Sequence, residues 1–449
     1  MKPTEIRVLL DTYRKLIRRN ATKHIANMFN KTHTADTALL FRDFSPKERI
    51  VLFSQMSPEY SAEVIRELDE TLVVELLTQR NAKEIQLMLK HVPSDDEADI
   101  FGILPEELSE EILNLMKEEE TSEIEELLKY DPTSAGGLMT PQYFALNEDT
   151  TIQEAINALH ESEEAEMTFY LYVTDDRNHL VGVVSLRQLI IHSPSKKLSQ
   201  IMNEKPISVL TDVEQEEVAK QVSRYNIIAI PVVDEENKLL GIITVDDVVD
   251  VIREEATEDF FRMAGAGKDR EILLKSTYDA AKLRFPWLLA TWAGGIFASV
   301  IIGKYQVLLT NWIILAAYMP IIVGMGGNIG TQSSTIIVRG LSTGRVSIDA
   351  WWTVLFKEMR VGVLLGLTYA ILLTLFASYF YGSNVTIGLA AGIGILASMT
   401  LATLTGTLAP ILLHRLNVDP AVATGPFVTT SIDIIGITIY LFVASYMLS

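Results

Sequence analysis

The feature that most constrains this chain is the near absence of charge in long stretches after Arg284. Four such intervals cover residues 285–303, 305–338, 361–413 and 420–449, and the last of them holds a single charge, Asp433. A helix needs about 20 apolar residues to cross a bilayer, and the third interval is long enough for two helices joined by a turn at residues 381–384. We therefore predict an α-helical membrane domain over residues 285–449 with five spans.

The charges between these intervals orient the predicted spans. Only Lys304 lies on the side away from the long N-terminal half. Basic residues gather on the other side, at Lys282, Arg284, Arg339, Arg345, Lys357, Arg360 and Arg415. Because positive residues favour the cytoplasmic ends of membrane helices, we expect the N-terminal half in the cytoplasm and the C-terminus outside.

The N-terminal half is strongly acidic. Of 38 basic and 58 acidic residues, only 8 and 4 lie after residue 280, which leaves a net charge of −24 on residues 1–280. Such a charge repels phosphates, so nucleic acid is not an expected partner. The chain has no cysteine, which excludes thiolate catalysis and cysteine-ligated zinc or iron–sulfur sites.

Residues 45–116 repeat every 12 residues. The units begin at Ser45, Ser57, Asp69, Asn81, Pro93 and Pro105, which are residue types that start helices. The eighth position of each unit is apolar: Leu52, Val64, Leu76, Met88, Ile100 and Ile112. Short helices that share an apolar stripe stack into arrays. We therefore predict an all-α superhelical domain over residues 1–130.

A longer repeat occupies residues 131–256. The segment 179–185 recurs as 238–244, and Met139-Thr140 recurs as Met202-Asn203. Each copy reads as strands alternating with helices and resembles a CBS domain, so we predict an α/β tandem CBS pair with copies at 131–199 and 200–256. The resemblance implies ATP at Tyr170, Arg187 and Asp246. The alternative is a module that serves only packing and dimerisation.

An acidic helix is predicted between this pair and the membrane. Asp247, Asp250, Glu254 and Glu258 recur at steps of three and four residues, which places four carboxylates on one helix face. Like charges at this spacing repel, and a divalent cation would relieve the repulsion. The alternative is a solvated surface helix. Residues 257–284 would then form a connecting helix that leads into the first span.

Asp433 is the residue of the membrane domain that most suggests chemistry. A carboxylate in mid-span is costly and usually marks an ion path, and no Lys or Arg lies deep in another span to neutralise it. We therefore expect a permeating cation beside it. The alternative is a protonated aspartate with a structural role.

Neutral oxygen donors and helix-breaking residues accompany Asp433. Pro320 and the glycines before Asn328 are expected to interrupt their span and to allow close helix approach, and Pro426 is expected to do the same. Asn328, Thr429, Thr430 and Ser431 suit a hydrated hard cation. Because Mg²⁺ keeps much of its water and needs few carboxylates, one aspartate per subunit fits it well.

With these motifs the chain resembles the MgtE family of magnesium channels over nearly its whole length. The matching segments are residues 136–141, 255–259, 326–333 and 431–433, beside the helical repeat and the CBS pair. The resemblance implies a homodimer in the bacterial inner membrane that takes up Mg²⁺, with Asp433 selecting the ion. It also implies a cytosolic plug helix, at about residues 268–283, that closes the pore when Mg²⁺ binds the soluble domains.

The same resemblance implies which residues sense Mg²⁺. They are Glu63, Asp95, Asp99, Gly136 through its carbonyl, Glu214, Glu216, Asp247, Asp250, Glu255, Glu258, Asp259 and the membrane-edge Asp419. Asn226 stands where the family pattern favours an acid, so that one regulatory site is not expected here.

Three other functions compete with this interpretation. A carrier of broader divalent specificity, for Mn²⁺, Co²⁺ or Ni²⁺, uses the same features. An intramembrane metalloprotease needs two histidines on one helix, but the membrane half holds only His414, so we do not expect an enzyme. A chloride channel is disfavoured by the small number of spans and by an acidic residue without basic partners.

Overall fold

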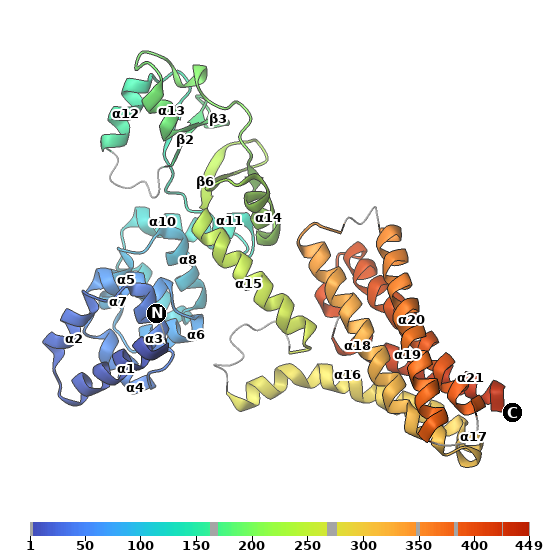
Figure 1. Cartoon of the computed structure of the whole chain (residues 1–449). Coiled ribbons are helices and arrows are strands. Elements are labelled where there is room, and N and C mark those ends of the chain that lie inside the picture. The colour runs from blue at the N-terminus through green and yellow to red at the C-terminus, as the bar shows by residue number, and fades with distance from the viewer. Residues whose placement is uncertain are drawn as a thin grey trace. The chain divides into compact units, whose positions relative to one another are not determined.

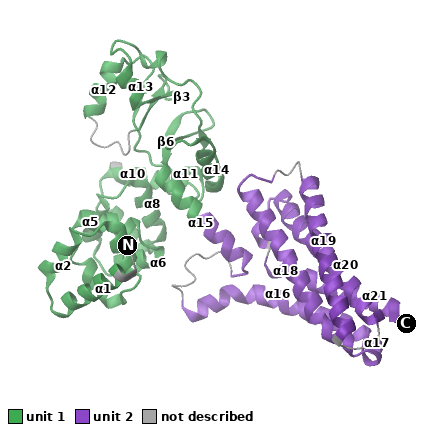
Figure 2. Cartoon of the chain, viewed as in Figure 1, with its two compact units in different colours: residues 1–253 green, residues 254–449 purple. Residues whose placement is uncertain are grey.

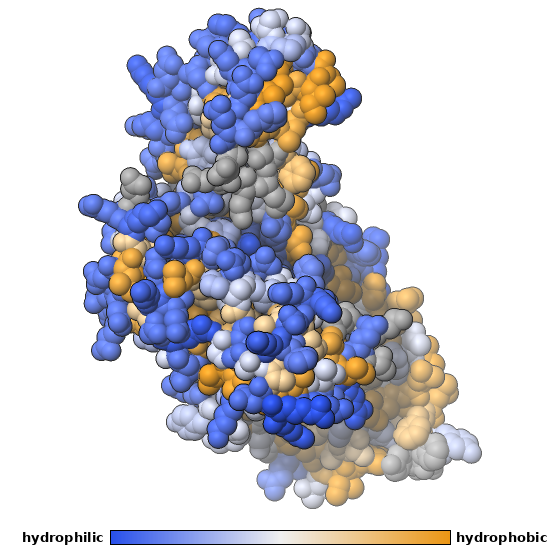
Figure 3. Space-filling model, turned by 90° about the vertical axis from the view of Figure 1, so that its left-hand side faces the viewer, coloured by the Kyte–Doolittle hydropathy of each residue, from blue (hydrophilic) through white to orange (hydrophobic). Residues whose placement is uncertain are grey.

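The computed structural model describes residues 3–161, 169–266, 276–346, 351–380, 385–423 and 425–448. The chain forms two compact units, Met1–Arg253 and Glu254–Ser449 (Figure 2). The first unit contains short helices and two small sheets, and the second contains long helices (Figure 1). Hydrophilic side chains cover most of the face of the molecule seen in Figure 3.

Ten short helices form the N-terminal part. They are α1 (Pro3–Arg18), α2 (Thr22–Phe29), α3 (Thr34–Phe41), α4 (Pro46–Phe53), α5 (Pro58–Arg66), α6 (Glu70–Leu77), α7 (Ala82–Leu89), α8 (Ser94–Ile103), α9 (Glu106–Leu113) and α10 (Glu118–Leu127). From α2 to α10 every helix starts 12 residues after the one before it. The repeat is therefore confirmed, and it extends two units before and one unit after the predicted range.

The chemistry of each unit explains this period. Ser45, Ser57 and Asn81 each accept a hydrogen bond from the backbone N–H three residues later, which caps the helix that follows. The apolar residues predicted at the eighth position are all buried, with Leu52 and Ile112 fully so. Stacking thus buries one stripe from each helix in a common core.

The CBS pair contains two three-stranded sheets, ordered β1-β2-β3 and β4-β5-β6. In each sheet the first pair of strands is parallel and the second antiparallel. The elements are α11 (Ala135–Leu138), β1 (Ala145–Asn147), α12 (Ile152–Glu161), β2 (Tyr170–Thr174), β3 (Leu180–Ser185), α13 (Leu186–Ile191), η1 (Leu198–Gln200), β4 (Val209–Leu210), α14 (Gln215–Tyr225), β5 (Ala229–Val233), β6 (Leu239–Thr244) and α15 (Val245–Met263).

The two copies are related by a local pseudo-symmetry. Asn178 and Asn237 occupy equivalent hairpin turns with a left-handed φ of 65°. The side chain of Asn178 donates to the Leu239 carbonyl, and that of Asn237 donates to the Leu180 carbonyl. Each turn thus binds the opposite copy, and asparagine tolerates the left-handed conformation that this requires.

Among its described residues, the second unit contains five helices long and apolar enough to cross a membrane, as predicted. They are α16 (Thr277–Lys304), α18 (Ile314–Ser342), α19 (Trp351–Phe380), α20 (Val385–Arg415) and α21 (Pro426–Leu448). Two short elements, α17 (Gln306–Asn311) and η3 (Pro420–Ala423), connect them. Helix α20 packs against α18, α19 and α21, so it forms the centre of the bundle.

Three expectations about where helices are interrupted or continuous are wrong. Helix α18 runs without interruption through Pro320, whereas the close helix approach expected of its glycines is confirmed. Pro426 begins α21, where its missing N–H costs nothing. Residues 257–284 are not one helix, because α15 ends at Met263 in a turn with Gly265 at a φ of +67° and α16 begins at Thr277. Residues 267–275, which hold the start of the predicted plug, lie outside the described residues.

Candidate cation sites

Asp433 lies on α21 opposite a glycine of α18. A Cβ atom added to Gly327 would lie 3.7 Å from Asp433 Oδ1, so the bare backbone of α18 faces the carboxylate. Asp433 is partly exposed in the single chain. Within the described part of the chain its carboxylate has no Lys or Arg within salt-bridge distance. The position is therefore open to a cation.

Small residues hold the helices close around this point. A Cβ on Gly330 would lie 2.1 Å from Ile432 Cδ1, and one on Gly406 of α20 would lie 2.3 Å from the Gly330 carbonyl oxygen. Only glycine permits such contact. The glycine-rich segment thus fixes the distance between α18, α20 and α21, and with it the position of Asp433.

The expected neutral donors differ in exposure. Asn328 is exposed on α18, on the same face as Gln332, Thr335 and Arg339. The hydroxyls of Thr429 and Ser431 donate to the carbonyls of Pro426 and Phe427, about one turn earlier in α21, which leaves only their oxygen lone pairs. Thr430 Oγ1 is buried without a hydrogen-bond partner among the described residues.

A buried carboxylate in the membrane domain was missed by the sequence analysis. Glu358 of α19 is 7% exposed and accepts a 2.9 Å hydrogen bond from Ser333 of α18. No spacing in the sequence singles it out, because Lys357 and Arg360 flank it as ordinary charges at a helix end.

In the first unit an acidic cluster lies between α8 and the start of α15. Asp96 forms an ion pair with Arg66, and burial raises the pKa of Asp96, as do the charges of Asp246 and Asp250. Asp247 is mostly buried, which raises its pKa to about 6 despite a 2.6 Å hydrogen bond from Thr244. The charges of Asp246 and Asp96 raise it further.

This cluster includes Asp247 and Asp250, which we predicted, and Asp96, which we did not. Asp95 and Asp99 lie on the same helix as Asp96, partly exposed and exposed respectively. Three acids in a row begin α8, and the sequence carries no signal of which one faces α15. Glu63 is exposed on α5, where its charge contributes to the raised pKa of Tyr60.

In the second unit, the end of α15 forms a charged contact with the edge of the membrane domain. Arg262 forms ion pairs with Glu258, one turn earlier, and with Asp419. Asp419 also accepts a 2.7 Å bond from the N–H of Ala421. Asp259 accepts a 3.2 Å bond from Ser342 of α18, and Glu255 is partly exposed.

Arg262 therefore lies between two predicted ligands, Glu258 and Asp419. Its side chain is 14% exposed, and its guanidinium neutralises carboxylates that we assigned to Mg²⁺. The i,i+4 spacing of Glu258 and Arg262 was visible in the sequence, whereas the contact with Asp419 was not.

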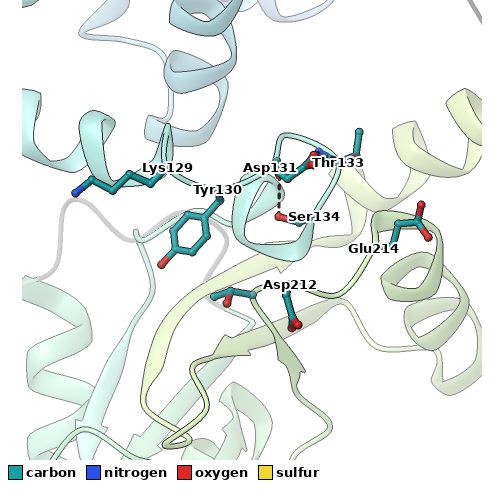
Figure 4. A pocket seen from close by; sticks show the side chains of 8 residues that line it. Lys129, Tyr130, Asp131, Thr133, Ser134, Asp212 and Glu214 are labelled. Atoms are coloured by element: carbon teal, nitrogen blue, oxygen red, sulfur yellow. Dashed lines mark hydrogen bonds between the residues drawn. The ribbon is translucent and has the colours of Figure 1, made fainter.

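A pocket of about 370 Å³ opens between the N-terminal part and the second CBS copy (Figure 4). Its walls include Lys129, Tyr130, Asp131, Asp212 and the predicted ligand Glu214. Gly136 lies close by, because its N–H donates to the Thr211 carbonyl and an added Cβ would collide with the Tyr130 ring. Glu216 forms an ion pair with Lys220 at 3.1 Å instead.

The residues expected to hold ATP lie on both CBS copies. Tyr170 of β2 pairs with Ser185 of β3, two residues before the exposed Arg187. Tyr170 also packs against a hydrophobic cluster that includes Leu239 and Ile242 of the second copy. Asp246 accepts a hydrogen bond from Thr244, so that threonine and aspartate are already oriented together.

These carboxylates are not arranged as a finished metal site. In the part of the chain that the structure describes, no three His, Asp or Glu side chains stand close enough to hold one ion together. The assigned ligands therefore stay predictions.

Comparison with known proteins identifies the family. The family described as "Divalent cation transporter", MgtE, matches residues 319–443, the MgtE intracellular N domain matches 32–133, and CBS domains match 135–194 and 198–254. A magnesium transporter MgtE of Bacillus subtilis is 33% identical over 431 residues, which cover 96% of this chain and 95% of the relative. The chain belongs to the MgtE family.

Other relatives agree with this assignment. A magnesium transporter MgtE of Thermus thermophilus is 40% identical over 70% of both chains. A crystal structure of the soluble part of a magnesium transporter matches with 30% identity and a TM-score of 0.50, covering 56% of this chain and 99% of that one. The cytosolic domain of the Mg²⁺ channel MgtE in complex with ATP matches with 32% identity and a TM-score of 0.52, covering 54% and 99%.

The predicted fold class is thereby confirmed: a helical MgtE N domain, a CBS pair and five apolar helices. The predicted family is confirmed as well, and the relatives that match 70% or more of the chain are named magnesium transporters.

Proposed function

We propose that this protein is a Mg²⁺-selective channel for magnesium uptake across the bacterial cytoplasmic membrane. One observation carries the proposal: Asp433, on a membrane helix, faces the bare backbone of Gly327 and has no basic partner among the described residues. A carboxylate in a membrane needs a compensating charge. A passing cation supplies it, and relatives named magnesium transporters identify that cation.

The pore forms in a homodimer. Asn328, Gln332, Thr335 and Arg339 are exposed along one face of α18 in the single chain. Polar side chains in membrane helices rarely face lipid and usually line a protein contact or a watery path. A second copy of the chain packed against this face shields these four polar side chains from lipid. It also places the Asp433 of each subunit beside the same ion path.

Cytosolic Mg²⁺ closes this pore. Asp96 and Asp247 are partly removed from water and lie near the exposed Asp246 and Asp250, so these like charges raise one another's electrostatic energy when no cation is present. Mg²⁺ bound there draws the N-terminal part toward α15. The plug that responds would include the first turns of α16, and the N-terminal domains lie in the cytoplasm with the C-terminus outside.

ATP is a second ligand of the cytosolic part. A related cytosolic domain was solved in complex with ATP, and Tyr170, Arg187 and Asp246 supply an aromatic face, a cation and a carboxylate. Such groups suit a base, a phosphate and a ribose respectively.

Transport of Mg²⁺ by an Asp433→Ala variant tests the proposal. In cells that lack other Mg²⁺ transporters, the variant should lose uptake and growth at low Mg²⁺ while reaching the membrane at normal levels. Thr368→Ala on α19 is the matched control, because that exposed hydroxyl bonds only its own helix. Normal uptake by Asp433→Ala would overturn the proposal. Measuring the uptake of Mn²⁺, Co²⁺ and Ni²⁺ in the same assay distinguishes a Mg²⁺-selective channel from a carrier of broader specificity.

A further inference from the structure

Glu358 of α19 carries a buried carboxyl group that the proposed function leaves without a role. It accepts a 2.9 Å hydrogen bond from the hydroxyl of Ser333 on α18, and both side chains are buried. Among the described residues no Lys, Arg or His lies within salt-bridge distance of it. Acidic residues buried in membrane helices are costly and usually functional, so the bond between Glu358 and Ser333 points to a role.

This bond connects two helices that otherwise meet mainly through α20. Gly362, one turn after Glu358, packs against Thr403 of α20, where an added Cβ would collide with the threonine hydroxyl. Gly330, three residues before Ser333, approaches the backbone of the same helix. Each helix is therefore fixed against α20 close to the bond, and the bond itself links α18 directly to α19.

Ser333 lies on the side of α18 away from its exposed polar face. At helical spacing it is about 140° around the helix from Asn328, which belongs to that face. Between these positions lie Gly327 and Gly330, whose lack of a side chain lets neighbouring helices approach closely. A surface without side chains offers little resistance to rotation of α18. A directional hydrogen bond on the buried side supplies that resistance.

We propose that Glu358 is a positioning residue for Mg²⁺ transport. Through Ser333 it fixes the rotation of α18, so that the backbone of Gly327 stays opposite Asp433 and Asn328 stays on the exposed face. The glutamate side chain is long enough to reach from α19 to α18, and another hydrogen-bond acceptor of the same length serves equally well. This role rests on the proposed function, in which Asp433 lies beside the ion path.

Thiol labelling of the full-length protein in lipid nanodiscs tests the position of α18 independently of transport. The chain has no cysteine, so Thr335→Cys places a single reactive thiol on the exposed face of α18. In that background, Glu358→Leu and Ser333→Ala should each change the rate of labelling by a water-soluble maleimide about fivefold or more. Glu358→Gln, which keeps the acceptor, should leave the rate within about twofold, and so should Lys357→Gln on the exposed side of α19.

Mg²⁺ flux into proteoliposomes tests the consequence for the ion path. Glu358→Leu and Ser333→Ala should each raise the half-saturating Mg²⁺ concentration about fivefold or more, and the double variant should raise it no further because both changes remove the same bond. A loss of folded protein would lower only the maximal rate. An unchanged labelling rate or an unchanged half-saturating concentration in Ser333→Ala would overturn the role of Glu358. Normal uptake by Asp433→Ala would instead overturn the proposed function, and the labelling would still show whether Glu358 holds α18.

Discussion

At Gly327 the structure limits how large a side chain can be beside Asp433. An alanine Cβ would lie at an ordinary van der Waals distance of 3.7 Å from Asp433 Oδ1, so Gly327→Ala should transport Mg²⁺ at close to the wild-type rate. Gly327→Leu should lower the rate at least tenfold, because its branched side chain fills the space beside the carboxylate. Flux into proteoliposomes measures both, and equal flux through the two variants would contradict the geometry.

At Gly330, unlike Gly327, even a single added carbon atom would overlap with a neighbouring residue. Its added Cβ would lie 2.1 Å from Ile432 and 3.3 Å from the Ala402 carbonyl oxygen. Gly330→Ala should therefore destabilise the membrane domain by about 1–3 kcal/mol through overpacking. The thermal midpoint in detergent should fall, whereas that of Gly327→Ala should not.

The raised pKa of Asp247 predicts a pH dependence of stability. Burial is the main reason that this pKa is about 6 in the folded chain, well above the ordinary value for aspartate. The folded state therefore holds a proton that the unfolded state releases, and stability is lost as pH rises toward 6. Without Mg²⁺, Asp247→Asn should unfold at a higher temperature than wild type above pH 6, and the difference should disappear near pH 4.

At the scale of elements, α15 carries two arginines in different surroundings. Arg262 is mostly buried between Glu258 and Asp419, whereas the ion pair of Arg253 with Asp250 is exposed. Removing one partner of a buried pair is strongly destabilising, whereas exposed pairs contribute little.

Arg262→Gln should therefore release the last turns of α15. Hydrogen exchange in residues 254–263 should become at least tenfold faster without Mg²⁺, and Mg²⁺ should restore protection if it replaces the guanidinium at Asp419. Arg253→Gln should leave the exchange there unchanged. Identical exchange in the two variants would show that Arg262 does not hold the end of α15.

The helices were more predictable than the contacts between them. The 12-residue units were recognisable where Ser, Asn, Asp or Pro began them, but Ala21, His33 and Lys117 begin further units without that signal. Hydrophobicity located all five long apolar helices. It did not show that α18 continues through Pro320, because neighbouring helices decide whether a proline interrupts.

The candidate sites were predictable by residue type and only partly by position. Asp433 stood out because it is alone in an apolar stretch. Asp96 and Arg262 were missed because their importance comes from Asp246 and Asp419, which are distant in the sequence and near in the fold.

At the scale of the whole molecule, the two halves of the chain differ in charge. The first 280 residues carry a net −24, which repels its own parts when no cation is bound. The membrane half has few charges, so we expect a response to cytosolic Mg²⁺ to begin in the first half. Several weak sites acting together would make closure of the pore steep in Mg²⁺ concentration. Moving an equilibrium from 99:1 to 1:99 takes about 5.5 kcal/mol of differential binding.

Single-channel recording across a range of cytosolic Mg²⁺ tests this account most directly. Wild-type channels in liposome patches should close as Mg²⁺ rises through the millimolar range. The Asp247→Ala/Asp250→Ala/Glu258→Ala variant, or a chain without residues 1–130, should conduct Mg²⁺ with the same unitary current and stay open at 10-fold higher Mg²⁺. Closure of the triple variant at the wild-type concentration would contradict the claim that these carboxylates sense Mg²⁺ and close the pore.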